Sequence, residues 1–272
     1  MRYDPVKKSL GKIFNKTPHL RILFYKMLDL LLLRSWYVRK ELKNWIKTAP
    51  AESSVLDAGS GFGQYVWWLS KLCKNAHITG VDVKSEQIDD CNRFFEKIGL
   101  SNHVIFKVAD LTQINEKEQY NMILSIDVME HIVEDELVFY NFFRALKKDG
   151  ILIISTPSDI GGSDTHHNEN KGVTGFVDEH VRDGYNMLNL EKKLKRAGFN
   201  NIQLNYMYGT PGNIAWKLSM KYPIKMLNFN KLFFVLLPFY YLVTYPFAFI
   251  LNFIDIKTKH EKGTGLIVVA KK

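Results

Sequence analysis

Short apolar runs alternate with longer amphipathic segments between Ser53 and Ala270. The runs are rich in β-branched residues, as buried strands are, and the segments between them repeat apolar residues at helical spacing. This alternation predicts an α/β fold with a doubly wound, mostly parallel sheet of seven strands. We expect strands at Ser53–Asp57, His77–Asp82, Val104–Val108, Met122–Ile126, Ile151–Ser155, Asn201–Tyr208 and Gly265–Ala270, and helices at about residues 63–74, 85–98, 134–148 and 187–197.

Two apolar segments lie outside this alternation. Residues 1–50 are predicted to form a basic helical lid, with one helix over about Leu20–Trp36. Residues 211–260 form an apolar, aromatic, helical insertion before the last strand. Residues 51–210 together with 261–272 then make up the domain that contains the sheet.

The insertion contains an uncharged run, Leu232–Ile254, that is long enough to span a bilayer. A single span would leave the last strand on the wrong side to join the sheet, and Pro238 and Pro246 are expected to divide the run into short helices. Two interpretations remain: helices that cover the active site, or an insertion that dips into one leaflet. Flanking lysines favour the second, because lysine beside apolar helices suits anionic headgroups: Lys217, Lys221, Lys225, Lys231, Lys257 and Lys259.

The net charge of +9 is unevenly distributed. Residues 1–50 hold 12 Lys and Arg against 3 Asp and Glu, residues 51–210 hold 16 against 23, and residues 211–272 hold 9 against 2. The basic ends are rich in Leu, Phe and Tyr and lack dense arginine clusters, which argues against nucleic acid as a partner and favours an anionic membrane surface. Ordinary solvated lysines on surface helices remain the alternative.

Cysteine usage and the N-terminal region favour the cytoplasm. Cys73 and Cys91 have neither the spacing of a metal site nor the density of a disulfide scaffold, which suggests a reducing compartment. The apolar stretch Leu20–Leu33 is interrupted by charged residues, and no small-residue cleavage site follows it. We therefore expect a cytoplasmic protein, with peripheral membrane contact as a further hypothesis.

The strongest motif is the glycine-rich segment Val55–Gly63, in which a buried strand leads through Asp57 into Gly59, Ser60 and Gly61. Glycines let the backbone adopt positive φ and approach a ligand closely. A carboxylate directly before them is unfavourable beside a pyrophosphate but favourable beside an ammonium group, such as that of S-adenosylmethionine (SAM). The third glycine also comes one residue earlier than in the dinucleotide fingerprint. SAM is therefore favoured over NAD(P).

Two further aspartates lie at or just after the ends of the next two predicted strands. Asp82 is placed to accept hydrogen bonds from ribose hydroxyls, with Val83 following it. Asp110 is placed for the exocyclic amine of adenine, with Leu111 beside it. A single Asp after a strand is usually a cap or turn residue, but carboxylates after three successive strands make such a coincidence less plausible.

Five segments together resemble the successive motifs of class I SAM-dependent methyltransferases: Val55–Gly63, Gly80–Asp82, Ala109–Asp110, Ser125–His131 and Gly150–Pro157. Within that superfamily they are similar to the branch that contains the ubiquinone-biosynthesis O-methyltransferase. The resemblance covers about residues 50–210 and the final strand. It implies a Rossmann-like sheet with an antiparallel last strand, SAM as cofactor, and Asp57, Asp82 and Asp110 as its contacts.

Candidates for substrate chemistry follow the fourth predicted strand, at Asp127, Glu130 and His131. In the ubiquinone-type branch the matching positions bind a divalent metal, with Glu at the first; Asp127 stands there in this chain, so no metal is assigned, and a site at these three residues stays an alternative. Asp127 is also expected beside the cofactor. His131 and His180 are candidate general bases, because histidine suits proton abstraction near neutral pH.

These observations predict a SAM-dependent methyltransferase acting on a lipophilic or membrane-associated small molecule, at oxygen. One alternative is a soluble methyltransferase of a polar metabolite or sugar, in which the aromatic insertion roofs the pocket. From other classes, an NAD(P) oxidoreductase is disfavoured by Asp57 and the glycine spacing, and a non-catalytic scaffold is disfavoured by the intact motif set.

Overall fold

The structure, a computed structural model, describes residues 17–161, 166–168, 172–174, 181–230 and 232–272. It divides into two compact units. The sheet unit comprises residues 40–156, 185–204 and 267–272, and the helical unit comprises residues 1–39, 157–184 and 205–266. The predicted division into lid, sheet domain and insertion stays a prediction.

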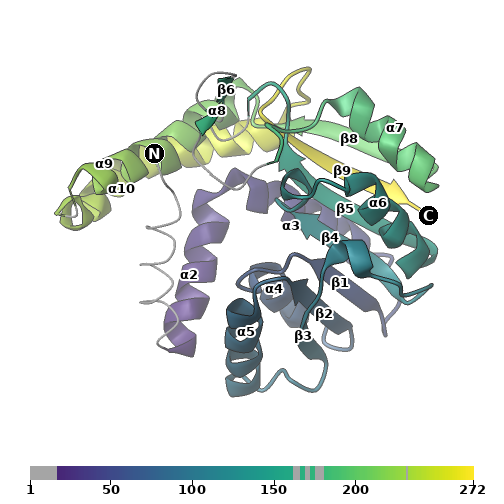
Figure 1. Cartoon of the computed structure of the whole chain (residues 1–272). Coiled ribbons are helices and arrows are strands. Elements are labelled where there is room, and N and C mark those ends of the chain that lie inside the picture. The colour runs from purple at the N-terminus through teal and green to yellow at the C-terminus, as the bar shows by residue number, and fades with distance from the viewer. Residues whose placement is uncertain (1–16, 162–165, 169–171, 175–180, 231) are drawn as a thin grey trace. The chain divides into compact units, whose positions relative to one another are not determined.

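The sheet has seven strands in the order β3-β2-β1-β4-β5-β9-β8 (Figure 1). Neighbouring strands among β1 to β5 run parallel. Backbone hydrogen bonds from Lys272 to Gly150 and from Asn200 to Lys271 show that β9 runs antiparallel to its two neighbours. The strands are β1 Ser54–Ala58, β2 His77–Asp82, β3 Val104–Val108, β4 Tyr120–Ile126, β5 Leu146–Pro157, β8 Asn201–Met207 and β9 Gly265–Lys271.

Four helices of the sheet unit connect these strands: α4 Gln64–Leu72, α5 Ser85–Lys97, α6 Asp135–Ala145 and α7 Met187–Ala197. Local chemistry sets their ends, as α7 illustrates. The Asn186 side chain caps its first turn by accepting from two backbone N–H groups, and Gly198 ends it at φ 114°. The predicted α/β fold is confirmed, including its doubly wound strand order.

One boundary differs appreciably from the prediction. Strand β5 begins at Leu146 rather than at Ile151. The pairing of β4 with β5 shifts register between Tyr120 and Met122, and Asp149 adopts a φ of 64°. An irregularity of this kind lets a strand continue through a turn-like Asp-Gly pair.

The N-terminal segment forms two helices where the sequence predicted one. Helix α2 covers Pro18–Leu31 and α3 covers Leu33–Ile46, with Leu32 in an extended conformation between them. The break leaves carbonyls at the end of α2 without helical partners. Side chains take their place: Ser219 Oγ donates to the Leu31 carbonyl at 3.2 Å, and Trp36 Nε1 donates to that of Asp29 at 2.8 Å.

The apolar insertion contains α8 (Thr210–Trp216), a π-helical segment (Lys217–Lys221), α9 (Tyr222–Phe229) and α10 (Phe233–Lys257). The expectation that prolines divide the run was wrong, because α10 continues through Pro238 and Pro246. A proline in a helix interior removes one N–H and frees one carbonyl. Such helices persist where the apolar surroundings and nearby hydroxyls compensate, as in membrane proteins.

A fully buried carboxylate, Asp255, fixes α10 within the helical unit. It accepts hydrogen bonds from the Tyr37 hydroxyl at 2.8 Å and the Gly212 N–H at 2.9 Å, and His260 Nε2 lies 3.2 Å from it. Burial, together with the charge of Asp255, raises the pKa of Tyr37 above its usual value. Several donors on one buried carboxylate offset its loss of hydration.

Candidate active site

The glycine-rich turn between β1 and α4 is tied to the end of β2. The N–H groups of Gly59 and Ser60 both donate to the Val81 carbonyl at 2.8 Å. Gly59 has a φ of 86°, and a Cβ there would lie 2.2 Å from a methyl group of Val128. Only glycine meets both constraints, which explains its place in the turn.

Gly61 lies in the same turn, but the space around it is open rather than crowded. Its φ is 50°, yet a Cβ there would meet nothing within 4 Å among the described residues. Its N–H donates to Asp82 Oδ2 at 3.1 Å. The turn is therefore fixed on one side, and at Gly61 it borders open space that a ligand could approach.

Asp57 is buried at the end of β1 with only 2% of its surface exposed. Its Oδ2 atom has no hydrogen-bond partner among the described residues, and neither has the buried Oγ of Ser60. Burial and the nearby charge of Asp82 raise the pKa of Asp57 to about 7. An unpaired buried carboxylate is costly, so this atom favours a cationic donor as its ligand.

Asp82 lies at the tip of β2, adjacent to β1 in the sheet. Besides the Gly61 N–H, it accepts the N–H of Lys84 at 3.0 Å. A carboxylate offers about four acceptor sites, so about two remain for further hydroxyl groups. The next residue, Val83, is 64% exposed and would offer an apolar surface to a flat ring.

Asp110 follows β3, which pairs with β2. Its Oδ1 accepts the Thr112 N–H at 2.9 Å and so caps a short 3₁₀ turn, Leu111–Gln113. The ordinary capping role is therefore present, and Oδ2 remains available in an exposed carboxylate. Leu111 itself is buried. The structure thus places Asp57, Asp82 and Asp110 at or just beyond the carboxyl ends of three adjacent strands.

Asp127 follows β4 in a conformation with a φ of 53°, and its Oδ1 lies 3.5 Å from Ser155 Oγ. Glu130 is buried and accepts from Thr156 Oγ1 at 3.1 Å. Both Glu130 and His131 belong to a 3₁₀ turn, Met129–His131. Among the described residues no three His, Cys, Asp or Glu side chains group closely enough to hold a metal ion. The geometry gives the metal alternative no support.

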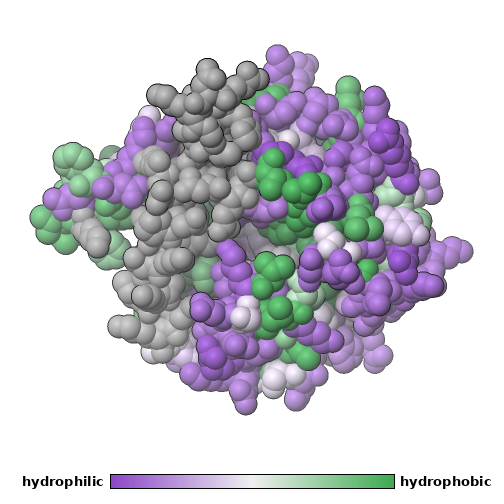
Figure 2. Space-filling model, viewed as in Figure 1, coloured by the Kyte–Doolittle hydropathy of each residue, from purple (hydrophilic) through white to green (hydrophobic). Residues whose placement is uncertain are grey.

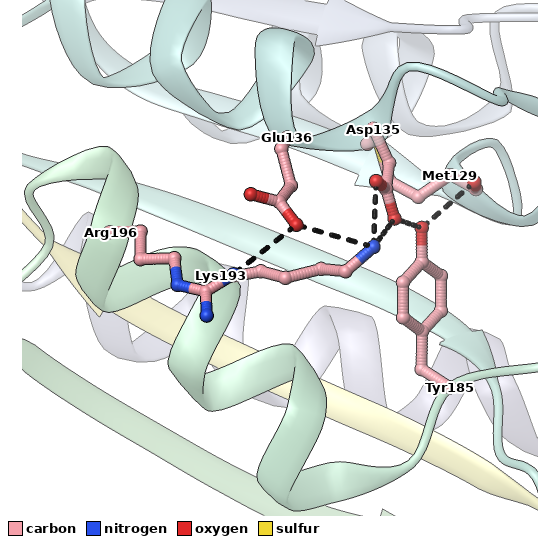
Figure 3. Close-up of polar contacts among 6 residues, drawn as sticks. All are labelled: Met129, Asp135, Glu136, Tyr185, Lys193 and Arg196. Atoms are coloured by element: carbon pink, nitrogen blue, oxygen red, sulfur yellow. Dashed lines mark hydrogen bonds and ion pairs between the residues drawn. The ribbon is translucent and has the colours of Figure 1, made fainter.

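A network that the sequence did not reveal holds this turn in place (Figure 3). The Tyr185 hydroxyl lies within hydrogen-bond distance of the Met129 carbonyl, at 3.0 Å, and of Asp135 Oδ2, at 2.7 Å. Lys193 from α7 pairs with the same buried carboxylate at 2.7 Å. Asp135, Tyr185 and Lys193 are up to 58 residues apart, and no local pattern marks them as partners. His180 lies outside the described residues.

The chain belongs to the family described as methyltransferase domain, whose model matches residues 50–217. The predicted resemblance to class I SAM-dependent methyltransferases is thereby confirmed. Relatives include an (S)-tetrahydroprotoberberine N-methyltransferase of Eschscholzia californica, 28% identical over 46% of this chain and 36% of the relative. A ubiquinone biosynthesis O-methyltransferase of Bradyrhizobium diazoefficiens is 28% identical over 38% of this chain and 39% of the relative.

Solved structures share the fold. A phosphoethanolamine N-methyltransferase 2 of Haemonchus contortus, in complex with S-adenosyl-L-methionine, has a TM-score of 0.56 at 18% identity and covers 92% of this chain and 60% of that one. A SAM-dependent methyltransferase of Mesorhizobium loti has a TM-score of 0.52 at 15% identity, with 85% and 97% covered. The chain spans about a third of the length of the curated relatives it matches.

Proposed function

We propose that the chain is a SAM-dependent methyltransferase that acts on a lipophilic small molecule, with oxygen as the acceptor atom. The observations that carry the cofactor assignment are the buried Oδ2 of Asp57 and the open space at Gly61 in the turn that follows; among the described residues the first has no hydrogen-bond partner and the second no neighbouring atom. The α-ammonium group of SAM would supply the missing donor and the positive charge. The family to which the chain belongs supports the same cofactor.

The remaining cofactor contacts are proposed from the acceptor atoms and apolar surfaces that the other residues of the site still have available. The free lone pairs of Asp82 would accept the ribose hydroxyls. Val83 and Leu111 would pack against the adenine, and Asp110 Oδ2 would accept from its amine. Asp127, at the tip of β4 next to β1, would face the methionine part, and the N–H groups of the Gly59–Gly61 turn would line it.

SAM supplies an electrophilic methyl group, so the protein's task is to align the acceptor with it and exclude water. An oxygen acceptor also has to lose a proton. His131, in the turn after β4, is the candidate for that role among the described residues. His180 is a second candidate, proposed from the sequence alone. If alanine at both positions left turnover unchanged between about pH 6 and pH 9, the base hypothesis would be wrong.

Support for the proposed acceptor comes from composition and from one relative. The aromatic insertion and the basic ends favour a lipophilic substrate met at a membrane surface by a cytoplasmic protein, and the ubiquinone O-methyltransferase is a relative named for oxygen methylation. A polar acceptor is the second candidate, because another relative is a phosphoethanolamine N-methyltransferase of Triticum aestivum, 27% identical over 56% of this chain.

The test incubates the full chain with methyl-labelled SAM and, separately, a lipid extract and a polar-metabolite extract. Label that enters the organic phase and that hot hydriodic acid releases as methyl iodide, as it does from a methyl ether, supports the proposal. Label confined to polar amines would replace the lipophilic acceptor by the second candidate. Asp57→Asn serves as the inactive control.

A further inference from the structure

Helix α10 exposes its apolar residues and turns its polar ones inward. Every exposed position from Leu232 to Ile254 carries an apolar residue; Leu242 is 76% exposed and Phe239 is 67% exposed. A water-soluble helix shows the opposite pattern. We call this outer surface the apolar face, and its most exposed members include Val235, Phe239, Leu242, Val243, Phe247 and Ile250.

The inward side of α10 is polar and hydrogen-bonded. The hydroxyls of Tyr240 and Tyr241 donate to the carbonyls of Leu218 and Ser219, both at 2.8 Å. Those carbonyls lie in the π-helical segment, where the regular helical bonding is altered. Thr244 Oγ1 donates back to its own helix at 2.9 Å. Polar groups that face protein while apolar groups face outward are typical of helices whose solvent is hydrocarbon.

The apolar face is also large and basic at its borders. Figure 2 shows hydrophobic side chains gathered at the end of the hairpin formed by α9 and α10, at the left of the view. Monomeric soluble proteins rarely expose apolar patches beyond a few hundred Å². Residues 211–260 hold six lysines against one acidic residue, Asp255, which is buried. This charge complements anionic headgroups.

The lysines also fix the orientation. Helix α10 has the length and hydropathy of a membrane span, although composition alone is weak support. The Leu218 carbonyl bonded to Tyr240 places Lys217 beside the middle of the apolar run. A hairpin crossing the bilayer would carry lysines of the Lys217–Lys225 segment, Lys217 first, into hydrocarbon, which is unfavourable for charged side chains. An axis parallel to the membrane surface lets them reach the phosphates instead.

We infer that the apolar face of α10 lies in the outer acyl-chain region of one leaflet of an anionic membrane, with the helix axis in the membrane plane and Lys217, Lys221 and Lys225 at the lipid phosphates. The inference deepens the proposed function by naming the surface that holds its lipophilic substrate. It rests on that function for this link alone, because the docking itself involves no cofactor chemistry.

Vesicle flotation with the full chain tests the inference. We expect the wild-type chain to float with vesicles of phosphatidylglycerol and phosphatidylcholine and to be released by high salt or alkaline carbonate. Phe239→Asp combined with Leu242→Asp should lower recovery about tenfold or more, because a carboxylate is strongly disfavoured in the acyl region. Leu188→Asp, which alters a residue of α7 that is 66% exposed, is the matched control and should float like the wild type.

Three results would overturn the inference. A wild-type chain that stays in the lipid-free fraction has no such docking face. Resistance to carbonate extraction means a spanning helix. If the wild-type chain does not bind vesicles but forms a dimer, and the double substitution dissociates that dimer, the apolar face is covered by a second copy of the chain. Calorimetry with SAM on each variant verifies folding and separates the two proposals, since a chain that floats without binding SAM would contradict only the proposed function.

Discussion

The Gly61 N–H donates to Asp82 Oδ2 at 3.1 Å and so joins the glycine-rich turn to the tip of the neighbouring strand. The same Asp82 adds to the electrostatic cost of ionising Asp57, whose pKa burial has already raised. Asp82 therefore orders the turn, while Oδ2 of Asp57 has no hydrogen-bond partner in the part of the chain that the structure describes. The arrangement stores unfavourable electrostatic energy that a cationic ligand would relieve.

Asp57→Asn is expected to abolish SAM binding and to stabilise the ligand-free chain. Because the pKa of Asp57 is raised to about 7 in the folded chain, its ionised carboxylate destabilises the folded state at higher pH. Each pH unit between this pKa and that of an ordinary carboxyl corresponds to about 1.4 kcal/mol. Urea unfolding at about pH 8 and calorimetry measure the two effects. Asp89→Asn, at an exposed position of α5, should change neither. A less stable Asp57→Asn variant would contradict the account.

SAM affinity should fall as the pH is lowered below about 7. In the ligand-free chain Asp57 is protonated below its pKa of about 7, whereas pairing with an ammonium requires the carboxylate. Binding must then release a proton, and the affinity should weaken by at most about tenfold per pH unit between about pH 7 and pH 5. Calorimetry in buffers of different ionisation enthalpy counts the released protons. No release at about pH 6 would contradict the prediction.

Alanine at the two turn glycines should have different effects. Gly59→Ala places a Cβ 2.2 Å from Val128 at a positive φ, so we expect a loss of stability of about 1–3 kcal/mol. Gly61→Ala meets no protein atom among the described residues and should be destabilised less, yet it narrows the space assigned to the cofactor. Thermal unfolding with and without SAM separates the two. Equal stabilisation of Gly61→Ala and wild type by SAM would show that the space is not the cofactor site.

Lys193→Met should destabilise the chain by about 3 kcal/mol, because it removes a cation that pairs with the buried carboxylate of Asp135 at 2.7 Å. Adding Asp135→Asn should recover part of the loss, since the buried charge that Lys193 had balanced is then gone. Lys195→Met removes an exposed pair with Glu191 and should cost less than about 1 kcal/mol. Urea unfolding measures all three, and similar losses for Lys193 and Lys195 would contradict the role of the buried pair.

The sequence predicted what depends on local pattern. The strands His77–Asp82 and Val104–Val108 and the helix at residues 187–197 match the structure, because alternation, caps and glycines determine such elements locally. Parallel strand order then brings Asp57, Asp82 and Asp110 to adjacent tips. The resemblance to known methyltransferase motifs supplied their proposed roles.

Features that depend on tertiary contacts could not be predicted from the sequence. The break at Leu32 is stabilised by Ser219, whose partner Leu31 lies 188 residues away, and the continuity of α10 through two prolines depends on its surroundings. The Tyr185–Asp135–Lys193 network likewise joins segments at least 50 residues apart. The conformational propensity of a local segment does not indicate which distant residues will contact it.

The most direct test of the central claim is a pair of calorimetric titrations of the full chain, one with SAM and one with NADH. Oδ2 of Asp57 is buried and has no partner within the described residues. It predicts that SAM binds at one site and that Asp57→Asn removes this binding, while NADH gives no saturable heat. Saturable binding of NADH with none of SAM, unaffected by Asp57→Asn, would contradict it.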